Sequence, residues 1–243
     1  MSSLNAYWQA SRQPRYSLLF ALPLLLLYEI LAFTLSGDGY AGIRNGADVL
    51  LKSLFVTLGG HRGLLVFSVL LLGIGLALVW RDLRARGGVQ LKVFGLMLVE
   101  SVAYALVFGL VTSVLTTLLL PDALLAMGVP PELSLATQLV ISLGAGIYEE
   151  LLFRVLLVSG LAALATRVFK FKPVPAGIFA TVLGALIFSA FHYIGAFGDP
   201  FTLGSFTFRA IAGALFSGLY LLRGFGITAW THALYDVFLT LRM

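Results

Sequence analysis

The chain has 243 residues, of which 60% are apolar and 11% are charged, with a net charge of +5 and a mean hydropathy of +1.00. Soluble domains carry about 25% charged residues, so this composition excludes a soluble globular protein. The positive charge lies between long apolar runs, which indicates anchoring at a membrane rather than nucleic-acid binding. Since the chain has no cysteine, disulfides, thiolate metal sites and cysteine nucleophiles are excluded as well.

The apolar runs predict an all-α integral membrane protein, because about 20 apolar residues in a helix cross the hydrocarbon layer. We expect the polar stretch 1–15 to precede the first span rather than to form a cleavable signal peptide. Without visible repeats or linkers, residues 1–243 are predicted to form a single polytopic domain, a bundle of six to eight spans around a polar intramembrane cavity. Seven spans fit best, at about 16–36, 63–80, 91–120, 133–166, 174–194, 204–222 and 226–241.

The segment between the first two spans, residues 43–58, is too charged to cross the membrane. Its apolar positions recur at helical spacing, which predicts an amphipathic helix lying in the membrane interface. These positions are Ile43, Ala47, Leu50, Leu51, Leu54 and Leu58.

Basic residues alternate between the connecting segments, and this pattern predicts the orientation. The third loop (121–134) and the fifth loop (195–205) contain no Lys or Arg, whereas the N-terminus and the second and fourth loops do. We therefore place the N-terminus in the cytoplasm, although the first loop is also basic. Seven spans put the C-terminus outside, and an eighth would reverse this. The basic residues of the N-terminus and of the second and fourth loops are Arg12, Arg15, Arg81, Arg84, Arg86, Lys92, Arg167, Lys170 and Lys172.

Ionisable side chains inside the predicted spans are functional candidates, because a charge at the bilayer centre costs at least about 2.5–3.5 kcal/mol on insertion scales. Glu29 and Glu100 stand alone among apolar neighbours, and we expect them to pair with charges elsewhere in the bundle. The other candidates are Glu149, Glu150, Arg154, His192, Arg209, His232 and Asp236.

Helical geometry separates the two neighbouring glutamates. Glu150 and Arg154 are four residues apart, so they stack on one face and can neutralise one another. Glu149 points about 100° away around the axis of an α-helix. This predicts a structural ion pair between Glu150 and Arg154, and a carboxylate at Glu149 that is free for chemistry.

Depth along the helices brings Glu149 and His192 together. Glu149 lies 18 residues before Arg167, and His192 lies 19 residues after Pro173. At 1.5 Å per residue, both side chains lie about 27 Å from the basic loop that joins their helices. Two antiparallel neighbouring helices would therefore place them at the same level.

His232 and Asp236 are one helical turn apart on one face, so Asp236 can orient the imidazole or act as a second ligand. Counted along the helix from Arg223, the basic residue before it, His232 lies only about 14 Å into the membrane. Either the segment 223–227 enters the membrane or the number of spans differs from seven.

Three motifs in separate spans resemble the CPBP (Abi) family of intramembrane proteases, which includes the CAAX prenyl endopeptidases. The resemblance covers about residues 135–241, which we take as the catalytic core. The first 130 residues carry no motif of the family and resemble it only in forming membrane spans. The motifs are Glu149-Glu150-x-x-x-Arg154, Phe188-x-x-x-His192 and His232-x-x-x-Asp236.

The resemblance implies an endopeptidase that uses a Glu/His-activated water, without a metal, on a membrane-embedded or lipidated substrate such as a prenylated CAAX protein. It also implies a prokaryotic inner or plasma membrane, with the bilayer as the other partner and no nucleic acid. In the implied roles, Glu149 activates water, His192 shares its proton, His232 with Asp236 stabilises the oxyanion, and Glu150 with Arg154 supports the site.

Other functions stay open at this point. The prenyl endopeptidases usually have Asn at the position of Asp236, and an ionised Asp cannot donate a hydrogen bond. Two histidines and two carboxylates could instead hold Zn²⁺ in a metalloprotease. A proton-coupled transporter or a non-catalytic scaffold or immunity protein would also bury ionisable side chains.

Overall fold

The structure, a computed structural model, describes residues 3–35, 42–125, 133–195 and 198–242, and all regular structure within them is helical. This confirms the predicted all-α fold class. Parts of the third and fifth loops (126–132 and 196–197) and the last residue of the first predicted span lie outside the described residues. The elements are α1 (Ser3–Ser11), α2 (Pro14–Leu35), α3 (Gly46–Gly59), α4 (His61–Arg86), α5 (Leu91–Leu119), η1 (Asp122–Leu124), α6 (Leu135–Gly144), η2 (Ala145–Val158), α7 (Ser159–Arg167), α8 (Pro173–Phe191), α9 (Leu203–Arg223) and α10 (Phe225–Arg242).

Among the described residues, five helices are long and apolar enough to cross a membrane, judged by length and composition. They are α2, α4 from Arg62, α5, α8 and α9, which correspond to five of the seven predicted spans. The predicted spans 133–166 and 226–241 are also helical, as the continuous run α6–η2–α7 and as α10. These two carry most of the polar candidates, so the chain is an integral membrane protein whose most polar helices are enclosed by apolar ones.

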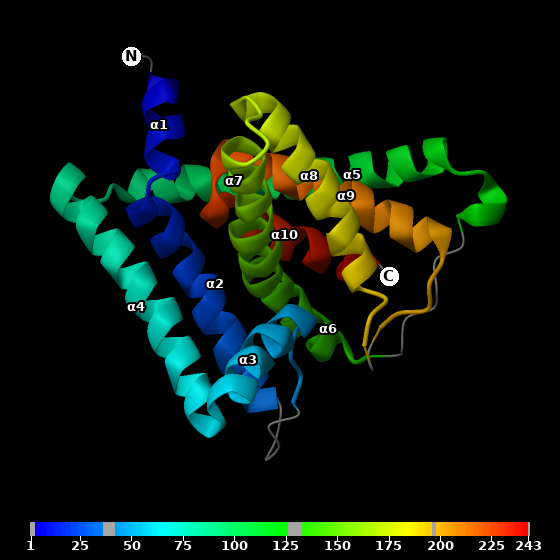
Figure 1. The fold of residues 1–243 in the computed structure, drawn as a ribbon, viewed down its shortest axis with the longest axis horizontal. Coiled ribbons are helices and arrows are strands. Elements are labelled where there is room, and N and C mark those ends of the chain that lie inside the picture. Colours follow the sequence, from blue (N-terminus) through cyan, green and yellow to red (C-terminus); the bar gives the residue numbers. More distant parts are fainter. Residues whose placement is uncertain (1–2, 36–41, 126–132, 196–197, 243) are drawn as a thin grey trace.

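Helix α10 lies at the centre of the bundle, in contact with α2, α5, α6, η2 and α9, whereas α4 lies at the periphery (Figure 1). Its start is buried against α2. Gly224 ends α9 with a φ of 80°, and the backbone N–H of Gly226 donates to Ser17 Oγ at 2.8 Å. A Cβ on Gly226 would lie 2.3 Å from the carbonyl oxygen of Ser17. The segment 223–227 is therefore enclosed by protein, and its depth in the membrane stays a prediction.

The isolated glutamates of the predicted spans are paired. Glu100 receives two hydrogen bonds from Arg223, at 2.6 and 2.8 Å, which join α5 to α9. Glu29 pairs with Arg44 at 3.2 Å and with Lys52 at 2.9 Å, which joins α2 to α3. Both therefore act as partners for charges elsewhere in the bundle, as expected from the sequence.

The helix predicted within 43–58 is present as α3, but it is packed on protein more than an interfacial helix would be. Ala47, Asp48 and Leu51 are buried, and α3 contacts α4 and η2. Leu54 and Leu58 point outward, with exposed fractions of 55% and 79%. One face of α3 thus belongs to the core, and this contact brings the start of α3 against η2.

The approach of α10 to η2 depends on Gly146, which yields a stability prediction. A Cβ at Gly146 would lie 2.5 Å from the carbonyl oxygen of Ala229 and 2.7 Å from the Cβ of Ala233. We expect Gly146→Ala to destabilise the purified protein by about 1–3 kcal/mol through overpacking. Its matched control is Gly160→Ala, where a Cβ meets nothing within 4 Å.

The free energy of unfolding of the control, Gly160→Ala, should instead rise by about 0.5–1 kcal/mol, because alanine has a higher helix propensity than glycine. Thermal unfolding in detergent, followed by circular dichroism, measures both variants. Equal melting temperatures for the two variants would contradict the close contact between η2 and α10.

Candidate active site

The helix that carries Glu149, Glu150 and Arg154 winds more widely than an α-helix. Residues Ala145–Val158 form a π-helix, in which hydrogen bonds span five residues. The wider turn reduces the angle between consecutive side chains below the 100° expected for an α-helix. The angle of 100° expected for an α-helix therefore does not apply here, and the two carboxylates face different ring nitrogens of one histidine, His232.

Glu149 lies between two histidines. Its Oε2 atom is 4.0 Å from Nε2 of His192 and 4.0 Å from Nε2 of His232. Its other oxygen, Oε1, accepts a hydrogen bond of 2.8 Å from Nδ2 of Asn45. Distances of 4.0 Å exceed a direct hydrogen bond and suit a bridging water molecule. The structure thus brings together Glu149 and the two histidines predicted from separate spans.

His192 caps the end of α8 with its ring fixed. Its Nδ1 is 2.9 Å from the carbonyl oxygen of Phe188, and since a carbonyl only accepts, Nδ1 carries the proton. In a neutral ring, Nε2 then presents its lone pair towards Glu149. The carbonyl oxygen of His192 accepts from the backbone N–H of Asp199 at 2.9 Å, and the carboxylate of Asp199 pairs with Arg209 at 2.5 Å.

His232 has a closer partner than the sequence predicted. Its Nδ1 donates to Oε1 of Glu150 at 2.6 Å, whereas its Nε2 is 3.6 Å from Oδ2 of Asp236. The ring of Phe216 stacks on the imidazole with centroids 4.3 Å apart. Glu150 therefore orients His232, while Asp236 stands beside the nitrogen that faces Glu149.

Glu150 also forms the predicted ion pair with Arg154. Its Oε1 is 3.3 Å from Nη1 of Arg154, and both side chains are fully buried. The guanidinium lies over the rings of Phe188 and Phe216, with its Cζ 4.4 and 5.6 Å from their centroids. One carboxylate thus serves two cationic or potentially cationic groups, which explains how a charged arginine is tolerated in an apolar interior.

The polar cluster is open on one side. The exposed fraction of the side chain falls from 28% at Asp236 and 22% at His192 to 10% at Glu149 and 0% at Arg154. The end of α8 and the second half of α10 therefore form the accessible side, and Arg154 closes the inner end. A substrate would reach Glu149 past His192 and Asp236.

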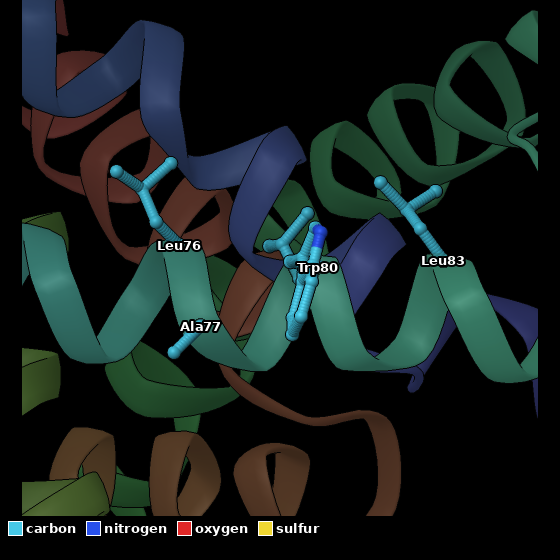
Figure 2. Close-up of a pocket in the computed structure, with 5 residues that line it drawn as sticks. Leu76, Ala77, Trp80 and Leu83 are labelled. Atoms are coloured by element: carbon cyan, nitrogen blue, oxygen red, sulfur yellow. The ribbon is translucent and has the colours of Figure 1, made fainter.

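Two hollows on the outer surface of the described residues lie away from the polar cluster. One hollow of about 480 Å³ follows α4, where Leu76, Ala77, Trp80 and Leu83 lie side by side (Figure 2). A groove of about 720 Å³ runs between α7, α8 and α9. Neither is lined by an ionisable side chain. Both are typical of a surface that faces lipid, and the polar cluster remains the candidate site.

A metal fits the observed arrangement poorly. Among the described side chains, no group of three or more His, Asp or Glu residues is placed so that it could hold a metal ion. Oε2 of Glu149 is 4.0 Å from Nε2 of each histidine, so the side chains would have to move to share a cation.

Comparison with known proteins identifies the segment that contains the cluster. The family described as "Type II CAAX prenyl endopeptidase Rce1-like" matches residues 131–238. This segment, a little under half of the chain, is therefore similar to the Rce1-like family. The match confirms the resemblance seen in the three motifs, and it indicates a protease. The search of curated proteins and that of solved structures found no match for the chain.

Asn45 is the site residue that sequence reasoning missed. It lies at the start of α3, outside the Rce1-like segment, yet its amide contacts Glu149. The sequence carried only a helix-start signal, an Asn before the apolar periodicity of 46–59, and that signal predicts a cap. Nothing along the chain indicates that this cap faces a residue 104 positions later.

The shared role of Glu150 predicts a loss of stability on neutralisation. Glu150→Gln can still accept from His232, but it leaves Arg154 as an unpaired buried charge, at a cost of about 3–5 kcal/mol. We expect a lower melting temperature and a lower folded yield. The double variant Glu150→Gln/Arg154→Met should recover much of the loss, because it removes the stranded charge. A fully stable but inactive Glu150→Gln would instead make Glu150 the reacting carboxylate.

Proposed function

We propose that the protein is an intramembrane endopeptidase in which Glu149 activates a water molecule. The observation that carries the proposal is the gap of 4.0 Å between Oε2 of Glu149 and Nε2 of both His192 and His232. A single water in this gap would face one carboxylate oxygen and two imidazole nitrogens. Burial in an apolar bundle excludes bulk water, so each of these dipoles acts more strongly than it would in solution.

The chemistry then follows from the partners of each group. Glu149, helped by Nε2 of His192, takes a proton from the water as its oxygen attacks the peptide carbonyl carbon. The C–N bond breaks, and the proton passes to the leaving amine, so that water and peptide become a carboxylic acid and an amine. A protonated His232 keeps one N–H on Glu150 and directs the other at the developing oxyanion. Asp236 stands beside that nitrogen and supports it.

The substrate class follows from the Rce1-like segment and from where the site opens. The family that matches residues 131–238 acts on prenylated CAAX proteins. The open side of the site, at His192 and Asp236, suits a polypeptide substrate that is already held at the membrane. We propose a membrane-embedded or lipidated protein as substrate, with a prenylated CAAX-type end as one form of it. The alternation of basic loops supports a cytoplasmic N-terminus. We place the protein in a prokaryotic inner or plasma membrane.

Replacing the proposed base tests the activity. In Glu149→Gln, peptide release should fall by at least about 10²-fold, since the amide cannot take a proton. The measurement is mass spectrometry of peptides released from membranes that contain the wild-type or the variant protein. The matched control is Glu100→Gln, a change of the same kind at a glutamate paired with Arg223 between α5 and α9. The control should release the same peptides as the wild type. Identical peptides from the wild type and from Glu149→Gln would refute the proposal.

Metal analysis separates the two hydrolytic mechanisms. If Glu149 and His192 polarise water directly, chelators should leave peptide release unchanged, and elemental analysis should find no stoichiometric metal in the purified protein. The zinc alternative requires one equivalent of Zn²⁺ held at ~2.0–2.2 Å by nitrogen and oxygen ligands. Loss of activity on chelation, with recovery on re-addition of zinc, would establish that alternative.

A further inference from the structure

We propose that Asn45 is a positioning residue for Glu149, so that the start of α3 completes a site whose other groups lie in the Rce1-like segment. Its amide holds one carboxylate oxygen of Glu149 and leaves the other to face the two histidines. The inference rests on the proposed function of Glu149, and it adds to that function a residue from the N-terminal part of the chain.

Every polar group of Asn45 has a defined partner apart from its second amide hydrogen. Nδ2 donates to Oε1 of Glu149 at 2.8 Å, and Oδ1 accepts from the backbone N–H of Ala47 at 2.8 Å. The backbone N–H of Asn45 donates to the hydroxyl of Tyr28 at 3.0 Å. With 2% of its surface exposed, the residue is fixed on three sides. Oε1 of Glu149 is therefore occupied, and Oε2 is the oxygen left for a substrate water.

The same contact is built into the packing of α6. A Cβ at Gly144 would lie 2.7 Å from Cβ of Asn45 and 2.5 Å from the ring of Tyr28. Only glycine lets α2 and the start of α3 come this close to the helix that continues into Glu149. The close approach is independent of the hydrogen bond, and it brings the Asn45 amide within reach of the carboxylate.

A buried charge cluster holds Tyr28 and α3 in this position. The Tyr28 hydroxyl donates to Oδ2 of Asp48 at 2.8 Å. Asp48 is fully buried and pairs with Arg44 and Lys52, each at 2.7 Å. The contact of Asn45 with Glu149 is thus the inner end of a rigid polar network that joins α2 and α3 to η2.

A helix cap alone does not account for the amide. The cap needs only an oxygen that accepts from the first turn, and Ser or Asp supplies it as well as Asn. Of these three cap residues, Asn alone combines that oxygen with an N–H donor on the same planar group. In Asn45 the oxygen serves the cap and the nitrogen serves Glu149, so the two roles can be separated by substitution.

Asn45→Ser and Asn45→Asp separate the roles, because both keep a cap oxygen and neither places an N–H beside Glu149. The serine hydroxyl lies on a shorter side chain, and an aspartate carboxylate only accepts. On a prenylated CAAX peptide we expect kcat to fall roughly 10- to 100-fold in both variants, because the Glu149 carboxylate is no longer held in place. KM should stay within about twofold, since the substrate surface remains. The melting temperature should fall less in Asn45→Ser than in Asn45→Ala, because serine keeps the cap, and it should also fall in Asn45→Asp, which buries a second carboxylate against Glu149. Asn45→Ala removes the cap too and should lower the melting temperature as well as kcat.

Wild-type turnover in Asn45→Ser and Asn45→Asp would overturn the proposal and leave Asn45 as a cap. A structure of Asn45→Ser adds a readout that does not depend on activity. In it, the Glu149 carboxylate should turn away from its position between His192 and His232, and an unmoved carboxylate would also contradict the proposal. If the wild-type protein releases no peptide, the proposed function fails, and this structural comparison still decides whether Asn45 positions Glu149.

Discussion

The charge of Glu150 must be compensated inside an apolar bundle, and much of the site depends on how this is done. A buried carboxylate is tolerated only with partners, and Glu150 has two, Arg154 on its own helix and His232 on α10. Because one oxygen contacts both groups, the position of His232 is tied to η2. Glu149, the next residue along the chain, is then held opposite the same imidazole.

The same requirement organises the periphery of the bundle. Glu100 and Arg223 join α5 to α9, and the main-chain oxygen of Trp8 on α1 accepts a further hydrogen bond from Arg223. Asp48 and Glu29 join α2 and α3 through Arg44 and Lys52. The first cluster links helices that are distant in sequence, and the second links two consecutive helices. In an apolar solvent such links direct the packing, because lipid offers helices little hydrophobic reason to associate.

Small residues set the distances that the polar contacts need. Gly146 lets α10 approach η2, and Gly144 lets Tyr28 and Asn45 approach the end of α6. A methyl group at either position would push apart the elements that carry His232 or Asn45. The polar site therefore depends on close helix packing, because its hydrogen bonds of 2.6–2.8 Å cannot form if the helices lie farther apart.

The sequence by itself determined the helical membrane class, the positions of the long helices and the motif residues of the site. These follow from local properties, because apolar run length fixes a span and the cost of buried charge marks Glu149, His192 and His232. Apart from the pair of Glu150 with Arg154, which spacing predicts, tertiary structure decided which partner each charge takes. Glu150 also contacts His232 because α10 packs against η2, and spacing along one helix cannot reveal a contact between two. Asn45 reaches Glu149 across 104 positions because Gly144 permits the contact, and no local pattern encodes such a distance.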